Sequence, residues 1–248
     1  MSVPDHYQPR PDLLEGRVIL VTGAGQGLGR AVAVTCARHG ATVALLGRKP
    51  EKLEATYDAI TEAGLAEPAL VPFDLAAANT TEFESLAQLL RRDLKRLDGI
   101  AHCAAHFLPL KPMADQTLEQ GLAFWRVNVA APFALTRACL PLLAAAADSS
   151  VVFTGETHGA EPKAFWGGFA VSKAALSPMA SIWADELERT GKPRMNVLIP
   201  GPIATPQRRQ SHPGEDPRGL RTAESAAEAF LWLLGPDSSA TTGSTLRL

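Results

Sequence analysis

The chain has 248 residues, 46% of them hydrophobic, which is enough to bury a full core within one domain. Its 24 basic and 26 acidic residues leave a formal charge of -2 without a basic block, which argues against nucleic acid and acidic membrane surfaces as partners. The expected partners are therefore small molecules and other subunits. Three cysteines lie far apart without a Cys-x-x-Cys, which predicts reduced thiols in a cytoplasmic protein.

Residues 1–15 are expected to form an N-terminal arm in front of a single α/β domain over residues 16–248. The first twelve residues are polar and carry three prolines, a composition that predicts neither a signal peptide nor a membrane anchor. A frayed terminus is the alternative for this arm. No uninterrupted apolar run approaches the length of a membrane span.

A glycine-rich turn follows the first predicted strand, residues 17–21, and precedes a predicted helix, residues 31–39. Its glycines are Gly23, Gly25, Gly27 and Gly29. They let the backbone turn sharply and remove the Cβ atoms that would keep a ligand away from the first helical amides. The turn therefore predicts a pyrophosphate site, with a tight turn that binds nothing as the alternative.

The end of the second predicted strand, residues 41–46, carries a basic residue, Arg48. An acid at such a place would hydrogen-bond the ribose 2′-hydroxyl of NAD, whereas an arginine suits the 2′-phosphate of NADP. We therefore expect NADP(H) to be preferred over NAD(H). A solvated surface arginine is the alternative. Pro50 is expected to start the next helix.

The third predicted strand covers residues 67–73 and is followed by Asp74 and Leu75. Asp74 could also cap a helix. A predicted helix over residues 81–97 leads into the fourth strand, residues 97–101, and a long helical stretch is predicted over residues 117–147. In that stretch Pro132 has no amide hydrogen, so the carbonyl of Asn128 loses its helical bond and needs another donor; a kink without function is the alternative.

The remaining predicted strands are residues 150–154, 194–199 and 244–248, and the last predicted helix is residues 222–234. Residues 207–220 are polar and contain two prolines, which predicts a loop or lid and no packed helix. The regular alternation of strands and helices predicts parallel pairing with right-handed crossovers.

Several motifs together resemble the short-chain dehydrogenase/reductase superfamily. These are Thr-Gly-x-x-x-Gly-x-Gly over residues 22–29, Asn128, Phe-x-x-x-Lys over residues 169–173 and Pro-Gly-x-x-x-Thr over residues 200–205. The arm and the Arg-Leu-Asp-Gly and Leu-Pro-Leu-Leu stretches at residues 96–99 and 140–143 resemble the YciK-type bacterial branch. The resemblance implies a Rossmann-like, doubly wound parallel seven-stranded sheet with the order 3-2-1-4-5-6-7. It also implies a homo-oligomer, a dimer or tetramer, packed through the helix that follows Lys173.

The resemblance also assigns cofactor contacts. Asp74 and Leu75 would meet the adenine, Lys173 the nicotinamide ribose and Thr205 the carboxamide. The family's Asn-Asn-Ala-Gly segment is replaced by residues 102–105, which keep only Ala104 in place and should form a slightly displaced loop. The full predicted cofactor set is Gly23, Gly25, Gln26, Gly27, Leu28, Gly29, Arg48, Asp74, Leu75, Ala104, Lys173, Pro200, Gly201, Ile203 and Thr205.

The catalytic positions depart from the family pattern. Phe169 stands where the family has its tyrosine, and Glu156, thirteen residues earlier, stands where it has its serine, while Asn128 and Lys173 are kept. Carbonyl reduction needs a positioned proton donor, which phenylalanine lacks, and an ionised Glu156 would only accept hydrogen bonds. Losing such an acid costs roughly 10²- to 10⁴-fold in rate. We also expect Glu156 to form an ion pair with Lys173.

Two interpretations follow. The chain is a cofactor-binding pseudoenzyme with weak or no carbonyl reductase activity, or it is an active NADP(H)-dependent oxidoreductase that uses a substitute acid. His158 is the best substitute, because its unperturbed pKa is about 6.5, although a surface loop histidine is the plainer interpretation.

Overall fold

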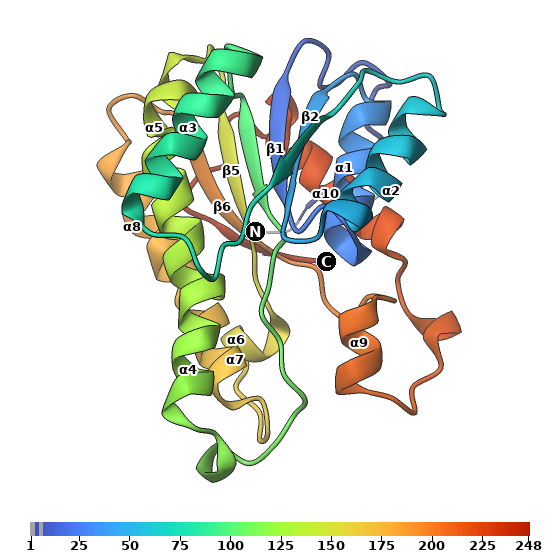
Figure 1. The fold of residues 1–248 in the computed structure, drawn as a ribbon, viewed down its shortest axis with the longest axis vertical. Coiled ribbons are helices and arrows are strands. Elements are labelled where there is room, and N and C mark those ends of the chain that lie inside the picture. Colours follow the sequence, from blue (N-terminus) through green and yellow to red (C-terminus); the bar gives the residue numbers. More distant parts are fainter. Residues whose placement is uncertain (1–2, 5–6) are drawn as a thin grey trace.

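A central parallel sheet organises the computed structural model, which describes residues 3–4 and 7–248. Seven strands in these residues have the order β3-β2-β1-β4-β5-β6-β7, and every neighbouring pair is parallel. They are β1 (Val18–Thr22), β2 (Thr42–Gly47), β3 (Ala69–Pro72), β4 (Gly99–His102), β5 (Ser150–Thr154), β6 (Arg194–Ile199) and β7 (Thr245–Arg247). The predicted Rossmann-like order is confirmed (Figure 1).

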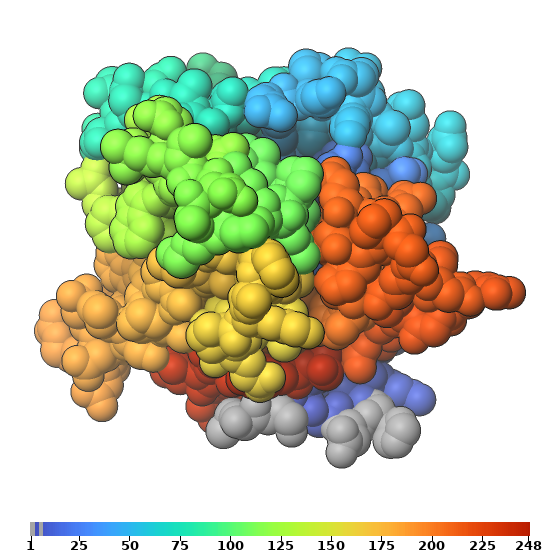
Figure 2. All heavy atoms as spheres, turned by 90° about the horizontal axis from the view of Figure 1, so that it is seen from below, coloured from blue at the N-terminus to red at the C-terminus, as the bar shows by residue number. Residues whose placement is uncertain are grey.

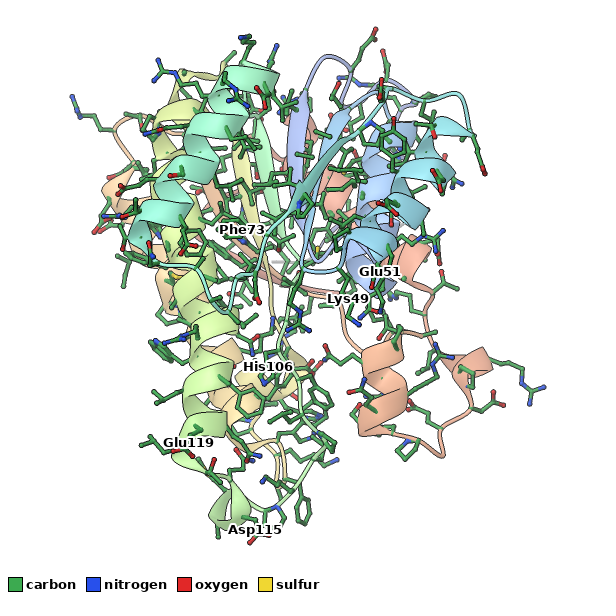
Figure 3. The ribbon with its side chains drawn as sticks, viewed as in Figure 1. Lys49, Glu51, Phe73, His106, Asp115 and Glu119 are labelled. Carbon is green, nitrogen blue, oxygen red and sulfur yellow. The ribbon has the colours of Figure 1, made fainter. Side chains whose placement is uncertain are left out.

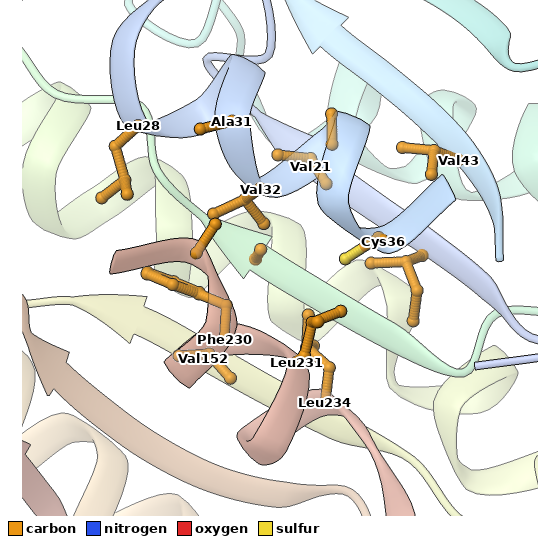
Figure 4. Close-up of a cluster of buried hydrophobic side chains, with 14 of the residues drawn as sticks. Val21, Leu28, Ala31, Val32, Cys36, Val43, Val152, Phe230, Leu231 and Leu234 are labelled. Atoms are coloured by element: carbon orange, nitrogen blue, oxygen red, sulfur yellow. The ribbon is translucent and has the colours of Figure 1, made fainter. Parts of the chain in front are cut away.

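Helices cover both faces of the sheet. On one face lie α1 (Gly27–Arg38), α2 (Pro50–Thr61) and α10 (Ala223–Leu234), and on the other α3 (Thr80–Leu94), α5 (Ala131–Ala145) and α8 (Leu176–Glu186) (Figure 1). The strands are buried on both sides, which explains why β1 and β5 appear in the sequence as unbroken apolar runs. Figure 4 shows the core between β1, α1 and α10, where Val32 of α1 and Phe230 of α10 are fully buried.

Shorter helices surround the carboxyl ends of the strands. They are α4 (Leu118–Trp125), α6 (Thr157–Ala160), α7 (Gly167–Ala174) and α9 (Pro206–Ser211), with short helical turns at η1 (Met113–Asp115) and η3 (Pro217–Gly219). A further turn, η4 (Pro236–Ser238), lies at the amino ends of the strands, where Arg194 of β6 donates to the Ser238 carbonyl. The segment predicted as a loop or lid over residues 207–220 begins with the short helix α9, none of whose residues is buried. Thr205 caps it by accepting the Arg208 amide, and Pro206 occupies its first position, so these two residues start a helix that the prolines further on cannot prevent.

The predicted helix over residues 117–147 changes its hydrogen-bonding pattern in the middle. A π-helical segment, η2 (Arg126–Ala130), joins α4 to α5, and the Ala131 amide donates to the Arg126 carbonyl five residues back. Because Pro132 has no amide hydrogen, the regular helical hydrogen bonds cannot continue through this place. Taken as one helix, Leu118–Ala145 is by length and composition apolar enough to cross a membrane, although Arg126 and Arg137 interrupt its apolar sequence, and half of its most apolar window is buried in the fold.

The described part of the N-terminal arm packs against the domain. Leu13 and Leu14 are buried in the core, and the Leu14 amide donates to the His39 carbonyl. The Tyr7 hydroxyl donates to Asp237 at 2.7 Å. The other residues expected in the arm, 1–2 and 5–6, lie outside the described residues.

Candidate functional site

A cleft of about 1060 Å³ opens at the carboxyl ends of the strands. The glycine-rich turn, the loops after β2 to β6 and the helix α9 line it. In Figure 3, Lys49 and Phe73 lie near the sheet end of this cleft, while His106 and Glu119 lie on the segments that extend beyond the sheet. Figure 2 shows the surfaces of α4 (green) and α9 (orange) on opposite sides of this end of the molecule. The site occupies the place where open parallel sheets bind their ligands.

The glycine-rich turn is a cradle that side chains would fill. Gly23 has φ +67° and approaches Ala104 so closely that a Cβ atom would lie 2.9 Å from its Cα. A Cβ at Gly29 would lie 2.2 Å from the Gly23 carbonyl oxygen. Gln26 precedes α1 and its side chain does not cap the helix, so the first amides of α1 remain available to an anion.

Gly25 is required for a different reason from the one expected. Its Cβ would lie 2.7 Å from the Lys52 Cβ, so this glycine permits the close packing of the turn against α2. The Lys52 ammonium donates to the Gln26 side chain, which brings a third basic residue beside Arg48 and Lys49 in the cleft. Sequence reasoning missed Lys52. Its position in the first turn after Pro50, close to the strand end, was the available signal.

All fifteen predicted cofactor residues line the cleft. Asp74 does not cap a helix: its carboxylate accepts the Ala76 amide in the turn after β3, while Asn79 caps α3. The Ala104 amide donates to the Thr22 hydroxyl at 3.1 Å, which ties the altered segment after β4 to the glycine-rich turn.

His102, the first residue of that altered segment, lies inside the sheet as the last residue of β4. Its ring stacks on Phe153 with centroids 5.0 Å apart, and Nε2 lies 2.9 Å from the Thr136 hydroxyl. Burial, aided by the positive charge of Lys173, lowers the pKa of His102 to about 3. This histidine is therefore neutral at physiological pH and supports packing instead of proton transfer.

Asn128 lies behind the cleft wall with its side chain buried. Its Oδ1 accepts the His106 amide at 2.7 Å, and its Nδ2 donates to the His106 carbonyl at 3.1 Å and to the Ser172 hydroxyl at 2.9 Å. The side chain thus fastens the segment after β4 to α7, which carries Phe169 and Lys173. That the Asn128 carbonyl is freed for a relay stays a prediction.

Phe169 belongs to an aromatic cluster at the cleft wall. The rings of Phe169 and Phe107 are perpendicular, with centroids 5.0 Å apart. The Phe169 centroid lies 6.2 Å from that of Phe124 and 6.1 Å from that of Trp166. The side chain is 2% exposed yet contributes to the lining of the cleft. The four rings come from three separate segments, and only Phe169 was singled out from the sequence.

Lys173 is buried and follows Phe169 by one helical turn on α7. Its Nζ donates to the Thr154 carbonyl at 2.7 Å and lies 6.0 Å from the centroid of the Phe169 ring. The expected ion pair with Glu156 is not among the contacts of the described residues; the strand-end carbonyl is the closer partner. Burial lowers the pKa of Lys173 to about 8, and the charge of Glu156 opposes this shift.

His158 lies on α6 and also lines the cleft. Its ring centroid is 4.3 Å from that of Trp166, and its Nδ1 lies 3.3 Å from the Glu161 carbonyl oxygen. The structure therefore brings the predicted substitute acid to the same cleft as Glu156, Phe169 and Lys173.

Comparison with known proteins agrees with this architecture. The family model for short chain dehydrogenases matches residues 17–216. The "Uncharacterized oxidoreductase YciK" of Escherichia coli (strain K12) is 41% identical over 97% of this chain and 94% of its own length. The solved structure of yciK from E. coli superposes with a TM-score of 0.93 over 98% of each chain.

Two further solved structures carry a bound nucleotide. A chain described as a short chain dehydrogenase from Shigella flexneri 2a, complexed with NADP, is 39% identical, with a TM-score of 0.92 over 96% of this chain and 99% of its own. One from Escherichia coli CFT073, complexed with NADPH, is 40% identical, with a TM-score of 0.93 over the same shares. The chain described here belongs to the short chain dehydrogenase family of oxidoreductases, in its YciK-type branch.

Proposed function

We propose that this protein binds NADP(H), in preference to NAD(H), in the cleft at the carboxyl ends of the strands, and that its tyrosine-dependent carbonyl reductase activity is weak or absent. The observation that carries the second part is the Phe169 ring on the cleft wall, one turn before Lys173, where a proton donor would be needed. The chain is then a pseudoenzyme of its family, with a binding or sensing role.

The cleft fits the dinucleotide at several places. The glycine cradle and the uncapped N-terminus of α1 suit the pyrophosphate, since both present amide groups without intervening side chains. Arg48, with Lys49 and Lys52 beside it, suits the 2′-phosphate of NADP. Relatives complexed with NADP and NADPH support this assignment.

When bound, the reduced cofactor would supply a hydride to a carbonyl carbon. The protein would hold the nicotinamide end with Lys173 and Thr205, as the resemblance implies. Phe169 has no proton to give to the carbonyl oxygen, and an ionised Glu156 would repel the negative charge that develops there. The site is thus better suited to holding the cofactor than to reducing a substrate with it.

An active oxidoreductase is the second candidate, because His158 shares the cleft with Lys173 and could supply the proton. Titration with NADPH, NADP+, NADH and NAD+, followed by a turnover screen on aldehydes, ketones and alcohols, separates the two. Tight NADP(H) binding with little turnover supports the proposal. Equal affinity for both cofactor pairs contradicts the NADP(H) preference, and rapid turnover contradicts the pseudoenzyme.

We also propose that the arm of residues 1–15 and the domain of residues 16–248 form a cytoplasmic homo-oligomer, a dimer or tetramer. Large apolar side chains on the helices beside α7 support this, since Trp125, Phe133 and Ile182 are each about half exposed or more. Sedimentation measurements on the purified chain test the subunit number.

A further inference from the structure

Lys173 is a buried ammonium group with unusually few partners. Its side chain is 5% exposed, and of its three N–H groups one donates to the Thr154 carbonyl. Within the described residues no other hydrogen bond or ion pair is recorded for Nζ, and the side chain lines the cleft. Because a buried charge without a close counter-ion is costly, such an arrangement points to a ligand or to chemistry at this place.

The charged and titratable groups around Lys173 come from the ends of two neighbouring strands. Glu156 follows β5, His102 is the last residue of β4, and Cys103 follows it. Glu156 favours the ammonium form, while burial favours the neutral amine and has the larger effect. At neutral pH the group is therefore mostly protonated but can release its proton readily, which is what general acid catalysis requires.

Other acids in the cleft are less well placed. Phe169, one helical turn from Lys173, carries no proton. His158 lies against Trp166, with Nδ1 directed at the Glu161 carbonyl. Burial and the positive charge of Arg48 lower the pKa of His106. The Asn128 side chain also hydrogen-bonds both the amide and the carbonyl of the His106 backbone.

We propose that Lys173 itself is the proton donor for any carbonyl reduction that this cleft performs. The hydride from NADPH forms a bond to the carbonyl carbon, the π electrons of the C=O bond move to the oxygen, and the Lys173 ammonium transfers a proton to that oxygen. The products are an alcohol, NADP+ and a neutral amine, and a proton taken up from the solvent that enters the cleft then restores the ammonium. This inference rests on the proposed NADP(H) binding and assigns the residual activity to one residue.

The test combines three measurements on the full chain. Fluorescence titration gives NADPH affinity, and the pH dependence of kcat is followed with benzaldehyde, acetophenone and 9,10-phenanthrenequinone as probes. The pH-dependent reaction of Lys173 with trinitrobenzenesulfonate, located by peptide mass spectrometry, gives its pKa without turnover. The variants are Lys173→Arg, which keeps the charge but holds its proton too tightly to donate it, Lys173→Met, Glu156→Gln and His158→Gln. Lys163→Met, at an exposed lysine of the same cleft, is the matched control.

We expect kcat to fall as pH rises through about 8, the pH range in which Lys173 also becomes reactive. Glu156→Gln removes the group that favours the ammonium, so both transitions should move to lower pH. Lys173→Arg and Lys173→Met should lose about 10²-fold or more in kcat, with Lys173→Arg still binding NADPH. Lys163→Met should leave the profile unchanged, and His158→Gln should keep the transition near pH 8.

Three results would overturn the inference: a kcat independent of pH between about 6 and 10, Lys173→Arg with wild-type kcat, or a pH transition of kcat that His158→Gln abolishes. NADPH binding without turnover of any probe also rejects it and leaves the proposed function standing. A wild-type chain that does not bind NADPH rejects the proposed function itself.

Discussion

Restoring the two missing hydroxyl groups is the most direct way to learn what the cleft has lost. In Phe169→Tyr the new hydroxyl should lie on the cleft side, because the other neighbours of the ring are the apolar Phe107, Phe124 and Trp166. Turned toward those rings, the hydroxyl would lack a partner at a cost of about 1–3 kcal/mol. On the cleft side it lies beside Lys173, whose ammonium would favour the phenolate.

The magnitude depends on Glu156. A proton donor contributes roughly 10²- to 10⁴-fold to the rate. A carboxylate about 5 Å from the developing oxyanion opposes it by about 1–3 kcal/mol for effective dielectric constants between about 80 and 20, or roughly 5- to 150-fold. Phe169→Tyr alone should therefore fall roughly 5- to 150-fold short of its potential gain. Glu156→Ser alone should recover little, since it adds a hydrogen-bond donor without an acid.

The double variant Glu156→Ser/Phe169→Tyr should exceed the product of the two single gains by about tenfold or more, because residues that act on one transition state are not additive. The assay is kcat/KM for the same carbonyl probes, with Phe165→Tyr as a control that places a hydroxyl on an exposed neighbouring ring. A double variant equal to the product of its singles would refute the reasoning. Robust wild-type turnover of an ordinary ketone, unchanged in Glu156→Gln, would show that the cleft is an active site of another kind.

Three further predictions concern the cofactor and the core. Arg48→Asp should reverse the preference for NADP(H) over NAD(H), measured as the ratio of the dissociation constants; an unchanged ratio would remove Arg48 from the site. If Glu156 lies near the nicotinamide, it should favour the cationic NADP+ over NADPH, and titration of Glu156→Gln should show that bias reduced. His102 is held neutral in the fold with a pKa of about 3, so the unfolded state alone takes up its proton between about pH 6.5 and 3. The free energy of unfolding should therefore decrease as pH falls through this range, by up to about 5 kcal/mol. His102→Gln should flatten that part of the curve in urea denaturation, whereas an unchanged slope would contradict the assignment.

Much of the fold could be predicted from the sequence. The strands β5 and β6 have the predicted bounds, residues 150–154 and 194–199, because strands buried on both faces form unbroken apolar runs. The sheet order came from the family resemblance, and the resemblance also identified Glu156 and Phe169 by their spacing to Lys173. The polar composition of residues 207–220 concealed the start of the short helix α9 at Thr205 and Pro206.

Only the tertiary structure decided which groups meet. Lys173 bonds the Thr154 carbonyl and makes no direct ion pair with Glu156, although both partners were near in the predicted site. Lys52 reaches Gln26 across the glycine-rich turn, and His102 is neutral because Phe153 and Thr136 enclose it. A sequence carries local propensity and spacing, whereas the partner of a buried charge and the pKa that results depend on distances between segments far apart in the chain, which packing alone sets.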